Sequence, residues 1–493
     1  MGRHRKYILR MLVFFVLAIY CVSLVSKVLL PKNFYNVDWA TTSAYLDFYH
    51  MERDSVDVLF LGSSHCVAAF SPVELYERYG IKSYNLGGEQ QSLVLSYYWL
   101  LEALRFQKPR YVFLDTFMLF PYDSSSPLNA SEASLRKGID FMRWSWVKVR
   151  AVRDICAIDG EQKLSGYFFP PERFHTRWKM LSEDDFRMGE MGGHESLMGF
   201  FPLNFACGDQ SFEPLSQDGG LTGYEEMLPV MREYLDRITA LCAEREINLV
   251  LTKSPTMFYS QEAFNSVNAY AFENGLEYID FNEESVYRAA GLEFAADSCD
   301  TDHASIPGAM KISDYIGAWL KDKVPSGQTD KAWEKRAEYY RHYLKDESLR
   351  TETDLCRYLQ LTEDDDYCVF LPAMGDASGL RSPETAEAFG SLGLDGEPAE
   401  GGYLAVMEAG EVLKEAWGEG VTEHQGTVRG GLVRYRIMSA GPVGGNDSSI
   451  VLNGGEISLK HPGLNIAVYC NDGKKLIDRV CFYAEQGEIR CIR

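Results

Sequence analysis

The stretch VDVLFLGSSHC, residues 56–66, decides the fold of this chain. Its apolar first half is typical of a buried β-strand. The apolar run ends at Gly62, and two serines, a histidine and a cysteine follow. Two interpretations fit such an ending: a tight turn, or a serine nucleophile that is held at the end of a strand.

Strand and helix patterns alternate on the C-terminal side of this stretch. Further strands are predicted over residues 81–87, 109–116, 247–253 and 276–281. Helices are predicted over residues 71–80, 90–107, 228–246, 262–275 and 307–322. The alternation predicts βαβ units, and therefore an α/β fold with a doubly wound parallel sheet. Ligands bind at the carboxyl ends of the strands in such sheets, and the motifs LGSSHC, NLGG and DTDH fall there.

Composition divides the chain into four regions. Residues 1–35 form a short basic stub and an apolar anchor, and residues 36–325 form the α/β domain. Residues 117–227 interrupt the alternation and are too long for a plain loop, so we expect an insertion that forms a lid or wall over the site. Residues 326–350 predict a charged helical linker, and residues 351–493 predict a strand-rich α+β domain with hairpin turns.

The N-terminal region has the charge pattern of a membrane anchor. Four basic residues precede or begin the apolar run, and residues 11–26 carry no charge. Residues 7–30 are long enough to span a bilayer of about 30 Å. The basic flank predicts a single-pass protein of the cell membrane, with a cytoplasmic N-terminus and an extracytoplasmic bulk. A cleaved signal peptide is the competing interpretation, but no A-x-A-like cleavage site follows the run, which favours a retained anchor.

Composition also excludes one class of partner. The 493 residues carry a formal charge of −22, whereas nucleic-acid binding requires clustered Lys and Arg. The eleven cysteines show no C-x-x-C pair and no metal-finger spacing. Disulfide pairing and a role as small buried apolar residues both stay open for them. No cofactor is predicted.

Ser64 and the DTDH motif together indicate nucleophilic catalysis. A serine hydroxyl needs a base, which is usually a histidine that a carboxylate orients. His303 is the predicted base and Asp300 the predicted orienting carboxylate, with Asp302 as the rival. These three residues have no further ligand cluster around them in the sequence, so no metal site is predicted.

An oxyanion hole requires N–H groups that point to the developing negative charge. The N–H of Ser64 and that of Gly87 or Gly88 are the predicted donors. Glycine is favoured there because it permits close approach of the backbone. His65 and Cys66 flank the serine, and turn and packing roles are predicted for both.

A second group of candidate residues lies in the insertion. His175, Arg177 and Trp178 combine an imidazole, a guanidinium and an indole, which together suit an anionic or sugar-bearing substrate. The alternative is that these three side chains pin the insertion to the core. The sequence leaves both possibilities open.

The ordered motifs resemble those of the SGNH, or GDSL-type, hydrolase superfamily. GSSH (62–65) corresponds to its first block, NLGG (85–88) to the second and DTDH (300–303) to the last. RFHTRWKMLSEDDF (173–186) and LTKSP (251–255) resemble its membrane-anchored branch, which includes DltD-like proteins of Gram-positive envelopes and alginate-type O-acetyltransferases. The resemblance covers residues 36–325. It implies a flavodoxin-like, three-layer SGNH fold with Ser64 as the nucleophile.

Two positions depart from the family pattern. Ser63 stands where the family has an aspartate before the nucleophile. The third block, G-x-N-D, has no clear counterpart, because VFLDTF (112–117) offers Asp115 but no asparagine. One oxyanion donor is therefore unassigned, and a side chain of the insertion is the conjectured substitute.

The C-terminal region weakly resembles the interleukin-like epithelial-to-mesenchymal inducer fold, which is also the stem domain of a glycosyltransferase. The stretches that carry this resemblance, in permuted order, are SIVLNGGEISLKHPGLNIAVYCNDGKKLIDRVCFYAE, VFLPAMGDASGLRSPETAEAFGSLGL and GGYLAV. The resemblance implies a glycan-binding accessory module. A spacer domain that binds nothing is the alternative.

These features predict a membrane-anchored serine acyltransferase or esterase that works through an acyl-Ser64 intermediate. The resemblance implies an acceptor hydroxyl on an envelope polysaccharide or a teichoic-acid-like polymer, and a membrane-bound O-acyltransferase as partner. The alternative is a non-catalytic envelope assembly or glycan-binding protein on the same fold.

Overall fold

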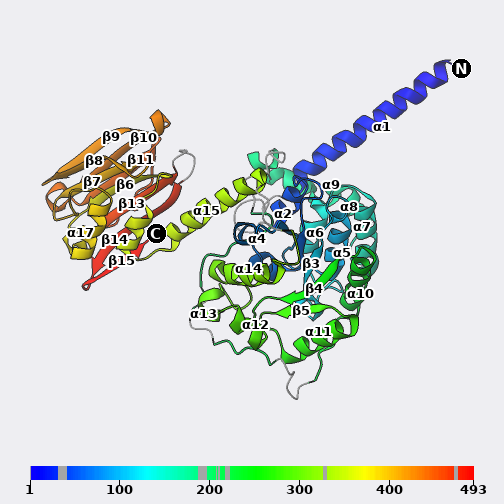
Figure 1. The fold of residues 1–493 in the computed structure, drawn as a ribbon. Coiled ribbons are helices and arrows are strands. Elements are labelled where there is room, and N and C mark those ends of the chain that lie inside the picture. The colour runs from blue at the N-terminus through cyan, green and yellow to red at the C-terminus, as the bar shows by residue number, and fades with distance from the viewer. Residues whose placement is uncertain are drawn as a thin grey trace. The chain divides into compact units, whose positions relative to one another are not determined.

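The computed structural model describes residues 2–31, 41–186, 197–206, 208, 211–216, 223–325, 330–470 and 476–493. They divide into two compact units, Met1–Tyr340 and Arg341–Arg493 (Figure 1). The division falls within helix α15 (Lys331–Thr351), in the region where the sequence predicts a helical linker. Residues 326–329 of that linker lie outside the described residues.

The first unit is built on the predicted parallel sheet. Its strands are β1 (Val58–Leu61), β2 (Ser83–Asn85), β3 (Tyr111–Asp115), β4 (Asn248–Lys253) and β5 (Glu277–Asp280). Their order is β2-β1-β3-β4-β5, and every neighbouring pair is parallel. From β1 the chain adds β2 on one side, and it then adds β3, β4 and β5 on the other side. This switch point lies between β1 and β3, so the carboxyl ends of these two strands flank the expected ligand crevice.

Helices cover the sheet on both sides, with α14 on one side and α5 and α10 on the other (Figure 1). Phe60, Phe113 and Val250 of the sheet form one buried cluster with Ile312 and Ile316 of α14. The helices are α3 (Ser64–Ala69), α4 (Pro72–Tyr79), α5 (Leu93–Ala103), α10 (Pro229–Glu244), α11 (Gln261–Asn274), α12 (Glu284–Ala289), α13 (Phe294–Asp297) and α14 (Ile306–Leu320).

The insertion at 117–227 is largely helical where the structure describes it. Its elements are η1 (Phe117–Leu119), α6 (Glu132–Phe141), α7 (Trp146–Ile158), α8 (Leu164–Phe168), α9 (Pro170–Phe174), η2 (His175–Met180) and η3 (Glu183–Phe186). Phe201 and Leu203 pack on Val67 and Ala68 of α3, and the Phe201 N–H donates to the Val67 carbonyl. This part of the insertion therefore lies against the helix that follows the GSSH turn.

Helix α1 (Gly2–Leu29) contains the stretch His4–Leu29, which is long and apolar enough to cross a membrane, and a signal sequence has the same properties. A short helix, α2 (Thr41–Phe48), precedes β1. Most of α1 is exposed, whereas Leu29 and Leu30 at its end are buried against the rest of the unit. Figure 1 shows this end of α1 beside α9.

The second unit is strand-rich, as predicted. Its ten-stranded sheet runs β12-β11-β10-β6-β13-β14-β15, and β7, β8 and β9 join through β6 and β10. The strands are β6 (Tyr367–Met374), β7 (Gly402–Glu408), β8 (Glu411–Gly418), β9 (Val421–Val428), β10 (Val433–Ala440), β11 (Asp447–Leu452), β12 (Gly455–Glu456), β13 (Gly463–Cys470), β14 (Leu476–Glu485) and β15 (Glu488–Ile492). Its helices include α16 (Leu355–Leu361) and α17 (Pro383–Ser391).

Cysteines that the structure describes as free thiols include Cys66, Cys242 and Cys481. Several are buried, including Cys66 in α3 and Cys481 in β14. Within the described part of the chain, the structure favours the small-apolar-residue interpretation over disulfide pairing. Cys207 lies outside the described residues.

Candidate active site

The turn after β1 is shaped by Gly62. Its φ of +151° is uncommon for residues with a side chain. A Cβ atom on Gly62 would lie 2.3 Å from the Cβ of Asp115 on β3. The Gly62 carbonyl accepts from the Gly88 N–H at 2.9 Å, which joins this turn to the NLGG motif. Glycine therefore lets β1 end close to β3 and to the second motif.

Substituting Gly62 by alanine is expected to lower the free energy of unfolding by roughly 2–4 kcal/mol, because the new methyl group clashes in a strained backbone conformation. Gly160→Ala is the matched control, since a Cβ there meets nothing within 4 Å. Denaturant unfolding of both variants measures the difference. Equal stability of the two variants would contradict this account of the turn.

Ser63 and Ser64 have different partners. Ser63 is the N-cap of α3, and its hydroxyl donates to the Asp115 carboxylate at 2.6 Å. The Ser63 N–H donates to the same oxygen at 3.1 Å. Asp115 thus stabilises the turn, and Ser64, the first residue of α3, is left to face the DTDH loop.

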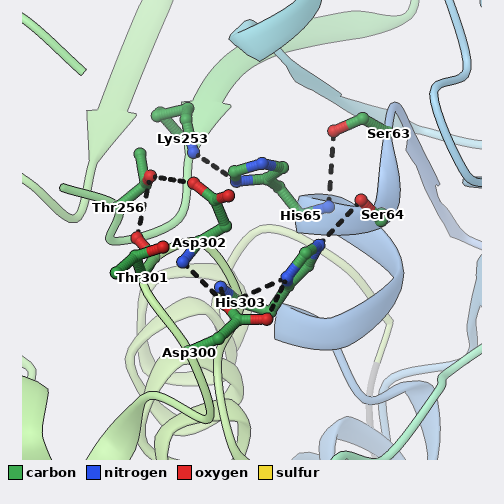
Figure 2. Close-up of polar contacts among 9 residues, drawn as sticks. All are labelled: Ser63, Ser64, His65, Lys253, Thr256, Asp300, Thr301, Asp302 and His303. Atoms are coloured by element: carbon green, nitrogen blue, oxygen red, sulfur yellow. Dashed lines mark hydrogen bonds and ion pairs between the residues drawn. The ribbon is translucent and has the colours of Figure 1, made fainter. Parts of the chain in front are cut away.

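The structure brings Ser64, His303 and Asp300 into one chain of hydrogen bonds (Figure 2). The Ser64 Oγ lies 2.8 Å from His303 Nε2. On the other side of the ring, His303 Nδ1 lies 3.0 and 3.1 Å from the two oxygens of Asp300. With the proton on Nδ1 donated to this carboxylate, Nε2 is free to accept the Ser64 proton.

Asp300, rather than its rival Asp302, is the carboxylate on His303. Its Oδ1 also accepts the N–H groups of Asp302 and His303, at 2.7 and 2.8 Å. Burial raises the pKa of Asp300, but the hydrogen bonds and charge of His303 and these N–H groups outweigh it and bring the pKa to about 2. Asp302 instead accepts from the Thr256 hydroxyl at 2.7 Å.

His65 occupies a second polar position beside Ser64. Its ring stacks on Phe117, with centroids 3.9 Å apart, and lies 5.1 Å from the ring of His303. The side chain is buried. Burial, with the nearby charges of Lys253 and His303, holds the pKa of His65 well below its ordinary value, so this ring is neutral.

Lys253, the last residue of β4, determines which nitrogen of His65 carries the proton. Its Nζ lies 2.9 Å from His65 Nδ1 and donates to the Ser254 carbonyl at 2.8 Å. Burial lowers the pKa of Lys253 to about 8, and carboxylates at Asp115 and nearby limit the fall, so Lys253 remains a cation at pH 7. An ammonium group only donates, so Nδ1 accepts and Nε2 carries the proton.

The sequence predicted a turn or packing role for His65 and no role for Lys253. One signal was available, because a lysine within the apolar strand LVLTK requires a buried partner. The partner itself could not be identified, since His65 and Lys253 are 188 residues apart.

The prediction that the N–H of Gly87 or Gly88 is an oxyanion donor needs correction, because both groups have acceptors within the fold. The Gly87 N–H donates to the Asn85 side-chain oxygen at 3.0 Å, and the Gly88 N–H donates to the Gly62 carbonyl. Both donors are therefore engaged within the fold. The Ser64 N–H lies in the first turn of α3, where backbone N–H groups have no acceptor within the helix.

Arg177 lies at the end of helix α1 rather than beside Ser64. Its Nη1 donates to the carbonyls of Val28, Leu29 and Leu30, at 3.3, 3.2 and 2.8 Å. Its Nη2 pairs with the buried Asp185 at 2.8 Å. The three carbonyls end helix α1, where a cation is favourable. Arg177 therefore pins the insertion to α1, and not to the core as the sequence alternative supposed.

The other two candidates of that group are on the surface. Trp178 is 65% exposed, and His175 Nδ1 contacts the Glu172 carbonyl at 3.1 Å. In the described residues, no hydrogen bond joins His175, Arg177 or Trp178 to the Ser64 site. Their predicted role as substrate-binding residues at Ser64 is not supported by this arrangement.

Replacing Arg177 by methionine is expected to loosen the insertion from α1, because it removes the hydrogen bonds to the carbonyls at the end of α1 and the ion pair with Asp185. We expect hydrogen exchange over residues 170–186 to accelerate at least tenfold in the full chain. Arg173→Met removes an exposed pair with Glu132 and should change exchange little. Similar exchange in both variants would contradict the pinning role.

An aromatic cavity of about 340 Å³ adjoins the site at Asp302. Phe117, which stacks on His65, forms part of its wall. The other aromatic residues around it are Phe120, Tyr122, Phe258 and Tyr259. A cavity of this size and lining suits a small acyl group or one sugar ring.

Comparisons with known proteins add little to this geometry. No protein-family model and no curated protein matches the chain. The chain is similar to a solved structure from Desulfitobacterium hafniense DCB-2, described as a lipolytic protein of the G-D-S-L family. The two are 12% identical, and the match covers 53% of this chain and 97% of that chain with a TM-score of 0.25. A similarity this weak does not assign a function to the chain, and the geometry of the Ser64 site is the stronger observation.

Proposed function

We propose that this protein is a serine acyltransferase or esterase of SGNH type. The observation that carries the proposal is the hydrogen-bonded chain from Ser64 through His303 to Asp300. It has the order of a nucleophile, a general base and an orienting carboxylate. Its position at the carboxyl ends of the strands is where doubly wound sheets bind ligands.

The reaction proceeds in two transfers. Ser64 Oγ gives its proton to His303 Nε2 and bonds to the carbonyl carbon of the acyl donor. The tetrahedral intermediate collapses, and the His303 proton leaves on the departing alkoxide. An acceptor hydroxyl then gives its proton to His303 and attacks the carbonyl carbon of acyl-Ser64. The second tetrahedral intermediate collapses by breaking the bond from that carbon to Ser64 Oγ, and His303 returns the proton to this oxygen. Asp300 stays ionised throughout and stabilises the imidazolium.

We assign the missing oxyanion donor to His65. The family pattern uses an asparagine in the third block, and this chain has none there. A neutral imidazole with its proton on Nε2 can donate a hydrogen bond to a developing oxyanion without giving up that proton. Lys253 fixes this tautomer through its contact with His65 Nδ1. The N–H of Ser64 is the second proposed oxyanion donor.

The acceptor class follows from the anchor and the aromatic cavity. The aromatic cavity reaches the site at Asp302 and at Phe117, which stacks on His65, and such a wall suits a sugar ring. The proposed acceptor is therefore a hydroxyl of an envelope polysaccharide or teichoic-acid-like polymer. A membrane-bound O-acyltransferase that supplies the acyl group is the proposed partner. With α1 as the anchor, the second unit is proposed as a glycan-binding accessory module outside the membrane.

A fluorophosphonate probe tests the proposal on the full chain in detergent. We expect covalent labelling of the wild type and none of Ser64→Ala. Ser63→Ala is the matched control, because its hydroxyl is bonded to Asp115 and not to His303. A folded wild type that is never labelled would overturn the proposal in favour of a non-catalytic envelope protein.

A further inference from the structure

Residues 143–180 of the insertion differ in character from the rest of the chain. They contain eight basic and four acidic residues, although the whole chain carries a charge of −22. The same segment exposes aromatic side chains to an unusual extent, with Trp146 82% exposed. The exposed aromatic residues are Trp144, Trp146, Phe168, Phe169 and Trp178. Basic and aromatic residues together are typical of a protein surface in the headgroup layer of a membrane.

This segment also holds the end of helix α1. Arg177 binds the last carbonyls of α1, and α9 and η2 both contact the helix. No residue of the apolar window of α1 is buried by the described part of the chain, as expected for a helix in lipid. If α1 crosses a bilayer, the segment that grips its end lies at the depth where the helix leaves the hydrocarbon.

A groove of about 780 Å³ separates α1 from the insertion. Its α1 wall includes Ile19 and Val22, and its opposite wall includes Phe141, Trp144 and Phe168. The lining is mostly apolar, which suits a hydrocarbon chain. Because the α1 wall belongs to the apolar helix, the groove adjoins the bilayer interior at the point where α1 enters it.

The cations of the groove determine what its polar end can bind. Lys148 already donates to the Asp140 and Met142 carbonyls, and Asp140 pairs with Arg136. Lys27 and Arg143 also line the groove, and neither pairs with a carboxylate in the described part of the chain. The Arg143 guanidinium lies over the ring of Tyr49, 4.2 Å from its centre, and keeps its charge. Two such cations at headgroup depth suit one phosphate group.

We propose that the 143–180 segment lies in the headgroup layer and that the groove holds one anionic phospholipid. Its acyl chain occupies the apolar walls, and its phosphate lies between Lys27 and Arg143. The proposal rests on α1 being a membrane anchor, and it does not depend on the chemistry of Ser64. The segment would thereby set the catalytic unit close against the membrane.

Tryptophan quenching tests the surface. The full chain is placed in nanodiscs of phosphatidylcholine and phosphatidylglycerol whose acyl chains carry bromine. We expect the quenched fraction of the fluorescence to fall by at least half in Trp144→Phe/Trp146→Phe. Trp417→Phe, an exposed tryptophan of the second unit, should leave it unchanged. If the double variant stays in the nanodisc and its quenched fraction does not fall, the proposed contact of this surface with the headgroup layer is wrong. The fluorophosphonate result does not affect this conclusion.

Lipid retention tests the groove. Native mass spectrometry of the full chain released from phosphatidylglycerol nanodiscs should show one bound lipid, retained at least fivefold less by Lys27→Ser/Arg143→Ser. Lys163→Ser is the matched control, because Lys163 is exposed in the same segment and does not line the groove. Equal retention by the two variants, or a chain recovered without α1, would overturn the lipid site.

Discussion

Ser64→Ala is expected to lower kcat for hydrolysis of p-nitrophenyl acetate by about 10⁴-fold, because it removes the hydroxyl that gives its proton to His303 Nε2. His303→Ala should lose about as much, since the serine then has no base. The double variant should be no slower than either single one, because the two residues act as a unit. Steady-state kinetics of the full chain in detergent measures all three.

The double variant makes this prediction specific. If Ser64 and His303 contributed independently, their losses would multiply, and the double variant would be far slower than either single one. Multiplying losses would therefore contradict a nucleophile–base pair, as would a Ser64→Ala variant with the wild-type rate. Thermal unfolding of each variant establishes that the loss does not come from an unfolded chain.

Lys253→Met is expected to lower kcat by about 10²-fold to 10³-fold, the loss typical of an oxyanion donor, while KM changes little. Without the ammonium group, His65 loses the described contact that keeps its proton on Nε2. Lys253→Gln is the conservative variant, since its amide can still donate to Nδ1, and it should recover a large part of the rate. The ring N–H signal of His65 in proton NMR should persist in Lys253→Gln and broaden in Lys253→Met.

A structural role for Lys253 would give a different pattern. Both variants would then lose stability in proportion to activity, and the glutamine would not recover the rate. A second variant, His65→Phe, keeps the stacking on Phe117 but removes both ring nitrogens. We expect it to match Lys253→Met in kcat. A His65→Phe enzyme at the wild-type rate would remove His65 from the oxyanion hole.

The sequence was sufficient for the sheet of the first unit. Strands such as VLFL and YVFLD are continuous apolar runs, and turns or capped helices separate them, so their local pattern matches their final structure. The strand-rich character of the second unit was predictable for the same reason. The strand order β2-β1-β3-β4-β5 was not predicted, because helical crossovers between parallel strands allow more than one order.

The site was only partly predictable. Ser64, His303 and Asp300 lie in short motifs whose chemistry is local, and the structure places them within hydrogen-bonding distance. The partners of Gly87 and Gly88 were not predictable, because the Gly62 carbonyl and the Asn85 side chain take their positions only in the folded turn.

The partners of Lys253 and Arg177 required the folded chain for another reason. Lys253 lies 188 residues from His65, and Arg177 lies 147 residues from the Leu30 carbonyl. The sequence around Lys253 or Arg177 does not indicate a partner at such a distance along the chain. For Arg177, the sequence left a substrate site and a structural pin both open, whereas the structure shows a contact with the end of helix α1.

The most direct test of the central claim is to trap the acyl-enzyme. The full chain is mixed with p-nitrophenyl acetate, quenched in acid within seconds and examined by intact-protein and peptide mass spectrometry. We predict one added acetyl group on Ser64 in the wild type, far less in His303→Ala because the serine then has no base, and none in Ser64→Ala. An acetyl group elsewhere, or none on a folded wild-type chain that hydrolyses the ester, would contradict Ser64 as the nucleophile.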